Sequence, residues 1–221
     1  MENLINALNR RYATKKFDPN KKLSQTDLDV LFESLRLSPS SFGLEPWRFI
    51  HVKNPEIRKQ LQDASRWQPQ VTESSDLIVI ATKINIQEVD VDEYIENIIQ
   101  TRTKDLAKLP EEERNTDKLT ELKNMILWTI WSRSPEQIRW RNQKQAYIAM
   151  WVLMTVCASM WIDSCPMEWF DPTKYNEILG LDKLWLTATL AIPVGYRSSN
   201  DKYASLSKVR FSKEKLLIEI D

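Results

Sequence analysis

Glycine is scarce in this 221-residue chain, which contains only three. Average usage near ~7% would give roughly 15. Turns and helix ends usually need glycine, because it adopts positive φ without a steric cost. Neither a G-x-G-x-x-G turn nor a glycine-rich P-loop is present, so a Rossmann-type dinucleotide site and a P-loop nucleotide site are both excluded.

Histidine and cysteine are nearly absent too, with one histidine (His51) and two cysteines (Cys157 and Cys165). A single histidine excludes a metal site built from histidines, and Ser–His or Cys–His catalysis would have to use His51. His51 lies in the apolar run WRFIHV, which favours a structural role. The cysteines form neither a metal motif nor a disulfide framework. They are typical of a reducing compartment, so we expect a cytoplasmic protein without a metal.

An excess of either charge is also missing, since 31 Lys and Arg balance 31 Asp and Glu. The chain therefore lacks the strongly basic character of nucleic-acid-binding proteins. No run approaches the ~18 apolar residues of a membrane span. The N-terminal MENLINALNRRY is amphipathic and polar, unlike a signal peptide. We expect neither a nucleic-acid nor a membrane partner.

The hydrophobic pattern predicts three strands, over residues 46–52, 76–83 and 186–196, and a last edge strand in LLIEI near the C-terminus. Helices are predicted between Ser24 and the Ser38-Pro39 stop, from Pro55 onward, and over residues 135–161. The mixture indicates one α+β domain over residues 1–221. Residues 84–134 are charged and weakly patterned. They form either a solvated helical excursion or a lid.

Two basic clusters lie at opposite ends of the chain, Arg11 with Lys15 and Lys208 with Arg210. Each alone is typical of a solvated face. Together they are able to clamp one phosphate dianion, because arginine engages phosphate bidentately and a dianion favours several cations. Composition does not say whether the two chain ends meet.

Seven segments together resemble the nitroreductase family of FMN-dependent NAD(P)H oxidoreductases, most closely its oxygen-insensitive nitroreductase and dihydropteridine-reductase-like branch. The segments are RRYATKKFD, SPSSFGLEPWRF, QPQVTESSDLIVIAT, KQAYIAM, IDSCPMEWFDP, LTATLAIPVGYR and SKVRF. The resemblance implies a three-layer α/β/α sandwich with a central, mostly antiparallel sheet. It also implies an intimate homodimer, with the long buried helix at the interface and two FMN sites between the subunits.

The resemblance also implies roles for individual residues. Lys15 is expected beside the N1/O2 edge of the flavin, where a cation stabilises the reduced ring. Lys15 and Glu168 are the catalytic candidates. The FMN-binding candidates are Arg11, Tyr12, Ala13, Lys15, Gln70 (or Gln68), Pro166, Met167, Glu168, Trp169, Lys208 and Arg210, with Pro39, Ser40 and Ser41 reaching the flavin from the other subunit. Backbone N–H groups of the loop 166–169 are expected to point at N5 and O4.

The activity implied is ping-pong hydride transfer from NADH or NADPH through FMN to a nitroaromatic, quinone, flavin or pteridine acceptor. Two alternatives remain open. One is a catalytically impaired flavin-binding homologue whose stacking face is obstructed by Trp169 or residues 84–134. The other is a phosphate or nucleotide binder without flavin.

Tryptophan is abundant, with nine residues, and several stand where the family commonly has glycine. These are Trp151, Trp161, Trp169 and Trp185, with Trp67 a further candidate, whereas Trp47 matches the family. Either the protein has repacked around real substitutions, or the printed sequence reads UGA as tryptophan where the organism reads glycine. With tryptophan at position 169 we expect a strained left-handed backbone and weaker FMN binding than with glycine.

Overall fold

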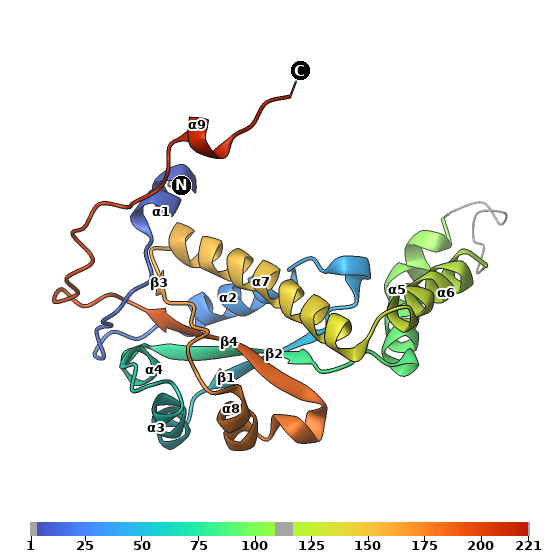
Figure 1. The fold of residues 1–221 in the computed structure, drawn as a ribbon, viewed down its shortest axis with the longest axis horizontal. Coiled ribbons are helices and arrows are strands. Elements are labelled where there is room, and N and C mark those ends of the chain that lie inside the picture. The colour runs from blue at the N-terminus through green and yellow to red at the C-terminus, as the bar shows by residue number, and fades with distance from the viewer. Residues whose placement is uncertain (1–3, 109–116, 221) are drawn as a thin grey trace.

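The computed structural model describes residues 4–108 and 117–220, and it is built on a four-stranded antiparallel sheet (Figure 1). The strand order is β1-β2-β4-β3. The strands are β1 (Trp47–Val52), β2 (Asp76–Lys83), β3 (Asp163–Ser164) and β4 (Leu186–Gly195). The three strands predicted at 46–52, 76–83 and 186–196 are therefore confirmed, and β3 adds a short edge.

Helices cover both faces of the sheet, as the three-layer prediction requires. Along β2, Leu77 and Val79 belong to one buried cluster, and Ile78 and Ile80 to the other. This alternation follows from the two-residue period of a strand. The first face packs against α3 (Pro55–Asp63), α4 (Gln70–Glu73) and α8 (Pro172–Leu179), and the second against α2 (Gln25–Arg36) and α7 (Pro135–Ser159).

The helices begin where the sequence supplies caps. Ser24 caps α2 in a capping box with Asp27, and Asn54 caps α3 just before Pro55. Ser134 caps α7, whose 25 residues make it the longest helix described. Side-chain oxygens at these positions satisfy N–H groups that have no partner within the helix. Local chemistry therefore fixes where these three helices begin.

The excursion predicted at 84–134 contains α5 (Glu88–Leu106) and α6 (Asp117–Trp131), and residues 109–116 lie outside the described part of the chain. The two helices pack on each other around a small cluster that includes Val91, Ile126 and Ile130. Figure 1 shows them beyond one end of the sheet, away from the chain termini. No helix among the described residues is both long and apolar enough to cross a bilayer.

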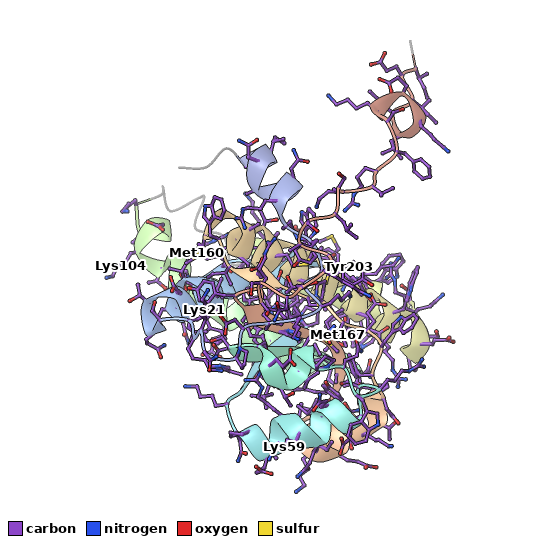
Figure 2. All side chains as sticks on the ribbon, turned by 90° about the vertical axis from the view of Figure 1, so that its left-hand side faces the viewer. Lys21, Lys59, Lys104, Met160, Met167 and Tyr203 are labelled. Atoms are coloured by element: carbon purple, nitrogen blue, oxygen red, sulfur yellow. The ribbon has the colours of Figure 1, made fainter. Side chains whose placement is uncertain are left out.

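At the C-terminus, the predicted strand in LLIEI is wrong. Residues 217–220 form no strand, and they follow a short helix, α9 (Lys213–Leu216). Leu217, Ile218 and Ile220 are exposed, since the segment runs away from the body and no sheet edge lies beside it (Figures 1 and 2). Strand propensity without a pairing edge does not make a strand. At the other terminus, α1 (Leu4–Arg10) packs on α7.

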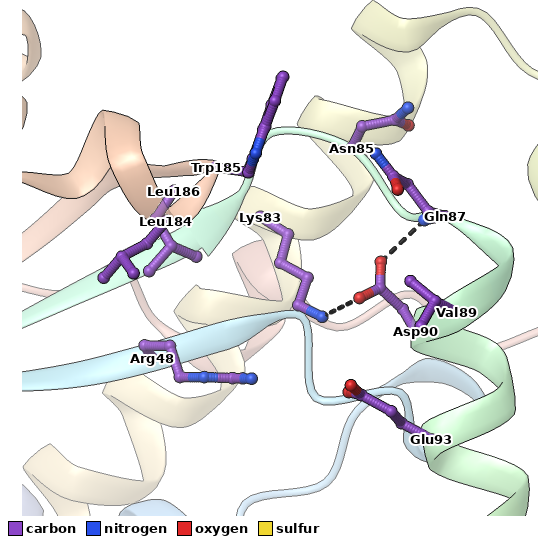
Figure 3. Close-up of a pocket in the computed structure, with 10 residues that line it drawn as sticks. All are labelled: Arg48, Lys83, Asn85, Gln87, Val89, Asp90, Glu93, Leu184, Trp185 and Leu186. Carbon is purple, nitrogen blue, oxygen red and sulfur yellow. Dashed lines mark hydrogen bonds and ion pairs between the residues drawn. The ribbon is translucent and has the colours of Figure 1, made fainter.

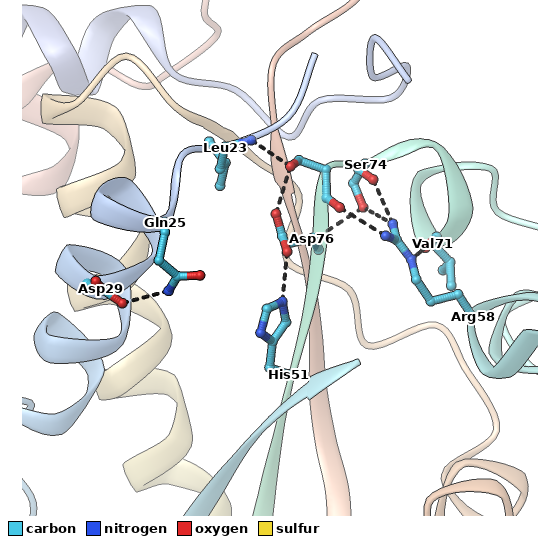
Figure 4. Close-up of polar contacts among 9 residues, drawn as sticks. Leu23, Gln25, Asp29, His51, Arg58, Val71, Ser74 and Asp76 are labelled. Carbon is cyan, nitrogen blue, oxygen red and sulfur yellow. Dashed lines mark hydrogen bonds and ion pairs between the residues drawn. The ribbon is translucent and has the colours of Figure 1, made fainter. Parts of the chain in front are cut away.

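A polar network ties the sheet to its flanking segments (Figure 4). His51 Nε2 lies 2.7 Å from Asp76 Oδ1, and Asp76 Oδ2 accepts a hydrogen bond from the Ser75 hydroxyl. The same hydroxyl oxygen accepts the Leu23 N–H at 2.8 Å. Nearby, the buried guanidinium of Arg58 donates to three backbone carbonyls. His51 thus has a cross-strand partner at the sheet, as its predicted structural role requires.

Candidate functional site

The two ends of the chain meet at the edge of the sheet. Ala13 forms a parallel bridge with Ser164 of β3, and Phe17 forms an antiparallel bridge with Arg197. The Asp18 N–H donates to the Tyr196 carbonyl at 2.8 Å. Residues 11–18 therefore lie between β3 and the segment that follows β4. This contact brings the two basic clusters together.

Where the ends meet, they enclose a cavity of about 460 Å³. Five cationic residues line this cavity, called the cationic cavity below, and no carboxylate from the described part of the chain does. The lining includes Arg10, Arg11, Tyr12, Ala13, Lys15, Tyr203, Lys208 and Arg210. The Lys208 ammonium donates to the backbone carbonyl of Arg11, which links the two predicted phosphate-binding clusters directly. Such a concentration of cations is matched to an anion that carries more than one charge.

Repulsion between the cations shows in their pKa values. Burial, followed by the nearby positive charge of Arg210, lowers the pKa of Arg11. Burial, then Arg11 and Arg210, lowers the pKa of Lys208. Like charges that are close together favour loss of a proton from each other. A bound anion would offset this repulsion, so the charges favour a negatively charged ligand.

Several polar atoms beside the cavity have no partner within the described protein. Arg11 Nε, Thr14 Oγ1 and Gln70 Oε1 are all buried and make no hydrogen bond. Gln70 Nε2 lies 4.0 Å from Cys165 Sγ, and the Lys15 ammonium lies 3.9 Å from the same sulfur. Buried polar groups without partners are uncommon in folded proteins. Their presence here fits a site whose ligand supplies the missing donors and acceptors.

The loop 166–169 is fixed to β4 by its backbone. Met167 and Ala191 exchange two hydrogen bonds, of 2.8 and 3.0 Å. Gln68 donates its side-chain amide to the Trp169 carbonyl at 3.1 Å, which assigns Gln68 to this loop and leaves Gln70 beside Lys15. The backbone N–H groups of Glu168 and Trp169 donate to no acceptor within the described residues. These two donors are thus available to a ligand.

Trp169 does not have the strained backbone expected from its sequence context. It is not among the residues with positive φ, and the Phe170 N–H donates to the Glu168 carbonyl at 2.9 Å across a tight turn centred on Trp169. Its indole is 71% exposed, with the Arg66 guanidinium 5.4 Å from the ring centroid. It does not line the cationic cavity. The predicted left-handed strain at this position is wrong.

Glu168 faces a different cavity from Lys15. Its Oε1 accepts a hydrogen bond of 2.6 Å from the hydroxyl of Tyr147 on α7. Both line a cavity of about 310 Å³ together with Arg139, Gln143 and Thr187. Burial, followed by the hydrogen bond to Glu168, raises the pKa of Tyr147 to about 12. Tyr147 therefore remains a donor throughout the neutral range, a role that no sequence motif indicated.

The Pro39–Ser41 segment lies apart from the cationic cavity. The Ser41 N–H donates to Gln145 Oε1 at 2.8 Å, and Arg141 donates to the Ser41 hydroxyl at 2.6 Å. Both partners are on α7. Within this one chain, Ser40 and Ser41 line neither the cationic cavity nor the cavity beside Glu168.

A third cavity, of about 420 Å³, lies near the beginning of α5 (Figure 3). Its charges balance, because Arg48 and Lys83 face Asp90 and Glu93. The Lys83 ammonium and the Asp90 carboxylate are already paired. This cavity therefore lacks the excess positive charge of the one at the chain ends.

The architecture is that of solved nitroreductases. A "putative nitroreductase ydfN" from Bacillus subtilis superposes with a TM-score of 0.82 at 19% identity, covering 98% of each chain. A "putative nitroreductase in complex with FMN" from Exiguobacterium sibiricum superposes with a TM-score of 0.80 at 19% identity, covering 100% of this chain and 98% of the other. At these identities the likeness shows the fold.

Sequence similarity adds the family. The model of the Nitroreductase family matches residues 8–196. A "Putative NAD(P)H nitroreductase" of Staphylococcus haemolyticus is 36% identical over 208 residues, covering 91% of each chain. "Putative NAD(P)H nitroreductase YfkO" of Bacillus subtilis is 34% identical over 214 residues, covering 93% of this chain and 94% of the other. The chain belongs to the nitroreductase family, a family of oxidoreductase enzymes.

Proposed function

We propose that the protein is an FMN-dependent NAD(P)H oxidoreductase that works by a ping-pong cycle. The observation that carries this proposal is the cavity at the chain ends, which five cations and no carboxylate among residues 4–108 and 117–220 line. The unpartnered Arg11 Nε in its wall supports a phosphate ligand. The Exiguobacterium structure is a complex with FMN, which supports FMN as the cofactor. The curated relatives are named NAD(P)H nitroreductases, which supports NADH or NADPH as the electron donor.

In this proposal the protein binds and orients, and the cofactor does the redox chemistry. When bound, FMN would supply hydride-transfer chemistry between NADH or NADPH and a small nitroaromatic, quinone, flavin or pteridine acceptor. Arg11, Lys208 and Arg210 would hold its phosphate. The Lys15 ammonium would stabilise negative charge at the pyrimidine edge of the flavin, and Gln70 would offer an amide to the same edge. The N–H groups of Glu168 and Trp169 would bind the ring.

The test is anaerobic reduction of FMN-loaded protein. Addition of NADH or NADPH should bleach the yellow flavin band within seconds, and an acceptor should restore it. A yellow protein that neither nicotinamide bleaches would support the impaired homologue instead. A colourless protein that FMN does not reconstitute would contradict any flavin function and favour a binder of other phosphates.

The phosphate clamp has its own test, because riboflavin lacks only the phosphate of FMN. Lys208→Gln and Arg210→Gln should each weaken FMN binding by about tenfold or more, as loss of a charge-assisted hydrogen bond does. Riboflavin binding should change little. Lys213→Gln lies in the same C-terminal segment outside the cavity and serves as the matched control.

We further propose that the protein works as a homodimer through α7. The helix buries Leu153 and Cys157 against the sheet, yet it leaves Trp140, Ile148 and Trp151 exposed along its outer side. The C-terminal segment adds further exposed apolar residues, among them Phe211 and Leu216. Contact with a second copy would bury these surfaces. In such a dimer, Ser40 and Ser41 would contact the flavin of the partner subunit.

A further inference from the structure

The carboxylate of Asp201, behind the cationic cavity, accepts hydrogen bonds from the segment that carries Lys15. Asp201 is only 5% exposed. Its Oδ2 accepts the backbone N–H of Lys15 at 2.8 Å, the N–H of Lys16 at 3.1 Å and the hydroxyl of Tyr12 at 3.0 Å. Its Oδ1 accepts the N–H of Tyr203 at 3.0 Å. Four donors from both chain ends therefore converge on one side chain.

None of these four donors is an ammonium or a guanidinium. The nearby guanidinium of Arg197 is engaged by Asp163, with a 2.9 Å hydrogen bond from Nε to Oδ1. It also lies 4.6 Å from the centroid of the Tyr12 ring. Among the residues that the structure describes, the Lys15 ammonium has no carboxylate partner, and it contacts the sulfur of Cys165. Asp201 thus holds the backbone of Lys15 and leaves its charge uncompensated.

This arrangement compensates the buried carboxylate of Asp201 without using the charge of Lys15. A buried carboxylate needs several hydrogen bonds to compensate its lost hydration. A neighbouring lysine would normally provide one through its ammonium, and its charge would then be unavailable to a ligand. Because backbone N–H groups satisfy Asp201, the segment is fixed while the Lys15 cation remains free for the cavity.

We propose that Asp201 is a positioning residue of the cofactor site, which sets where the Lys15 charge lies relative to a bound flavin. This inference rests on the proposed flavin function. Asp201 does not line the cavity itself. Its effect reaches the cofactor through the backbone of Lys15 and Lys16 and through the ring of Tyr12. The polar stretch SSND gave no signal of this role, because the contacts are almost all with backbone.

Asp201→Asn tests the proposal sharply, because an asparagine offers only one acceptor oxygen. Its amide N–H₂ must face either the Lys15 and Lys16 N–H groups or the Tyr203 N–H, so one donor set is lost. FMN affinity should fall at least tenfold. The midpoint potential of the FMN that still binds should become more negative, since a displaced Lys15 stabilises the reduced ring less. An unchanged potential would overturn the positioning role.

Asp163→Asn is the matched control. Asp163 is also buried and belongs to the same edge, but its hydrogen bonds go to Arg197. The Asp163→Asn substitution should lower the free energy of unfolding and leave the midpoint potential of the flavin as in the wild type. Equal shifts of potential in both variants would mean a general loosening of the edge and would overturn the proposal. If Asp201→Asn does not fold, Asp201→Glu is the second variant, because it keeps the charge but displaces the acceptor oxygens. An unchanged midpoint potential of the flavin in that variant would also overturn the proposal.

A measurement without cofactor separates this proposal from the proposed function. In the flavin-free protein, Asp201→Asn should increase amide hydrogen exchange across residues 12–16 by tenfold or more, while Asp163→Asn should not. If the wild type binds no FMN, the flavin function fails but this exchange result still stands. If exchange across 12–16 is the same in wild type and Asp201→Asn, the anchoring itself is wrong, whatever the cofactor result.

Discussion

At the scale of single residues, tryptophans account for three of the six described non-glycine residues with positive φ. Trp67, Trp161 and Trp185 have φ values of 58°, 61° and 54°, in the left-handed region. That conformation costs about 1–2 kcal/mol for a residue with a Cβ. All three are positions where the family resemblance predicts glycine. Trp151 and Trp169 share that prediction but have no positive φ, so backbone conformation accounts for three of the five positions.

Trp161 shows the demand for glycine most clearly. It follows the last turn of α7, where the Ile162 N–H donates to the Cys157 carbonyl at 2.8 Å and the Trp161 N–H to the Ala158 carbonyl at 3.3 Å. This pair of bonds defines a Schellman motif with Trp161 at the position that favours glycine. We expect Trp161→Gly to raise the free energy of unfolding by about 0.5–1 kcal/mol, after the loss of the Arg10 contact with the ring.

Urea unfolding followed by circular dichroism measures this effect. Trp140→Gly is the control, since Trp140 is exposed inside the helical part of α7, where glycine should destabilise by about 1 kcal/mol. A Trp161→Gly protein less stable than the parent would contradict the strain argument. The hypothesis that UGA encodes glycine is decided by the gene, because UGG codons at positions 151, 161, 169 and 185 would exclude it.

At the scale of secondary-structure elements, a hydrogen bond joins α7 to the loop 166–169. Tyr147→Phe removes the donor to Glu168 and keeps the ring. Hydrogen bonds to charged groups contribute about 1.5–3 kcal/mol, and partial exposure of this pair places the expected loss near 1 kcal/mol. Tyr94→Phe, in α5, is the control. In a double-mutant cycle, strictly additive effects of Tyr147→Phe and Glu168→Gln would show that the two side chains are not coupled.

The hydrogen bonds to Asp201 that connect the two chain ends should contribute less to stability in acid. Burial acts to raise the pKa of Asp201, but hydrogen bonds from Tyr203, Lys15 and Lys16 outweigh it and the net pKa is lowered. A carboxyl with a lowered folded pKa contributes stability that is complete above its unfolded value of about 3.9 and is lost as pH falls below it. Urea midpoints measured from pH 6 to 2.5 should decline below about pH 4, and less steeply in Asp201→Asn. Parallel curves would contradict this assignment.

Elements with strong local signals were predictable, and those that depend on partners were not. Buried runs bounded by turns predicted β1, β2 and β4 almost to the residue, and the Ser24 and Asn54 caps predicted the starts of α2 and α3. LLIEI has the composition of a strand but meets no edge, so its prediction was wrong. The two-residue strand β3 has too little pattern to recognise.

At the scale of the whole molecule, association through α7 makes a specific prediction. Trp151→Gln should weaken self-association at least tenfold, equivalent to about 1.4 kcal/mol, because it puts a polar group into the exposed apolar row. Sedimentation velocity over a concentration series measures this. Trp67→Gln is the control, because Trp67 is even more exposed than Trp151 but follows α3 on the opposite face of the sheet. A wild type that stays monomeric at high concentration would contradict the dimer.

The site was predictable from the sequence only where family motifs carry it. The sequence showed two separate basic clusters, Arg11 with Lys15 and Lys208 with Arg210. Only the fold shows that the two clusters line one cavity. Asp201 and Tyr147 escaped notice because their roles arise from partners more than 20 residues away in the sequence. Long-range hydrogen bonds to backbone leave no local pattern to read.

Eight of the nine tryptophans are more than half exposed, and Trp47 alone is buried. Indole emission shifts to longer wavelength in contact with water, so the native protein should already fluoresce like an unfolded one. Denaturation would then move the emission maximum little, and acrylamide would quench most of the native signal. A flavin bound in the cationic cavity would instead dim this emission by energy transfer, which makes the surface indoles a sensitive optical reporter of cofactor occupancy and a poor one of folding.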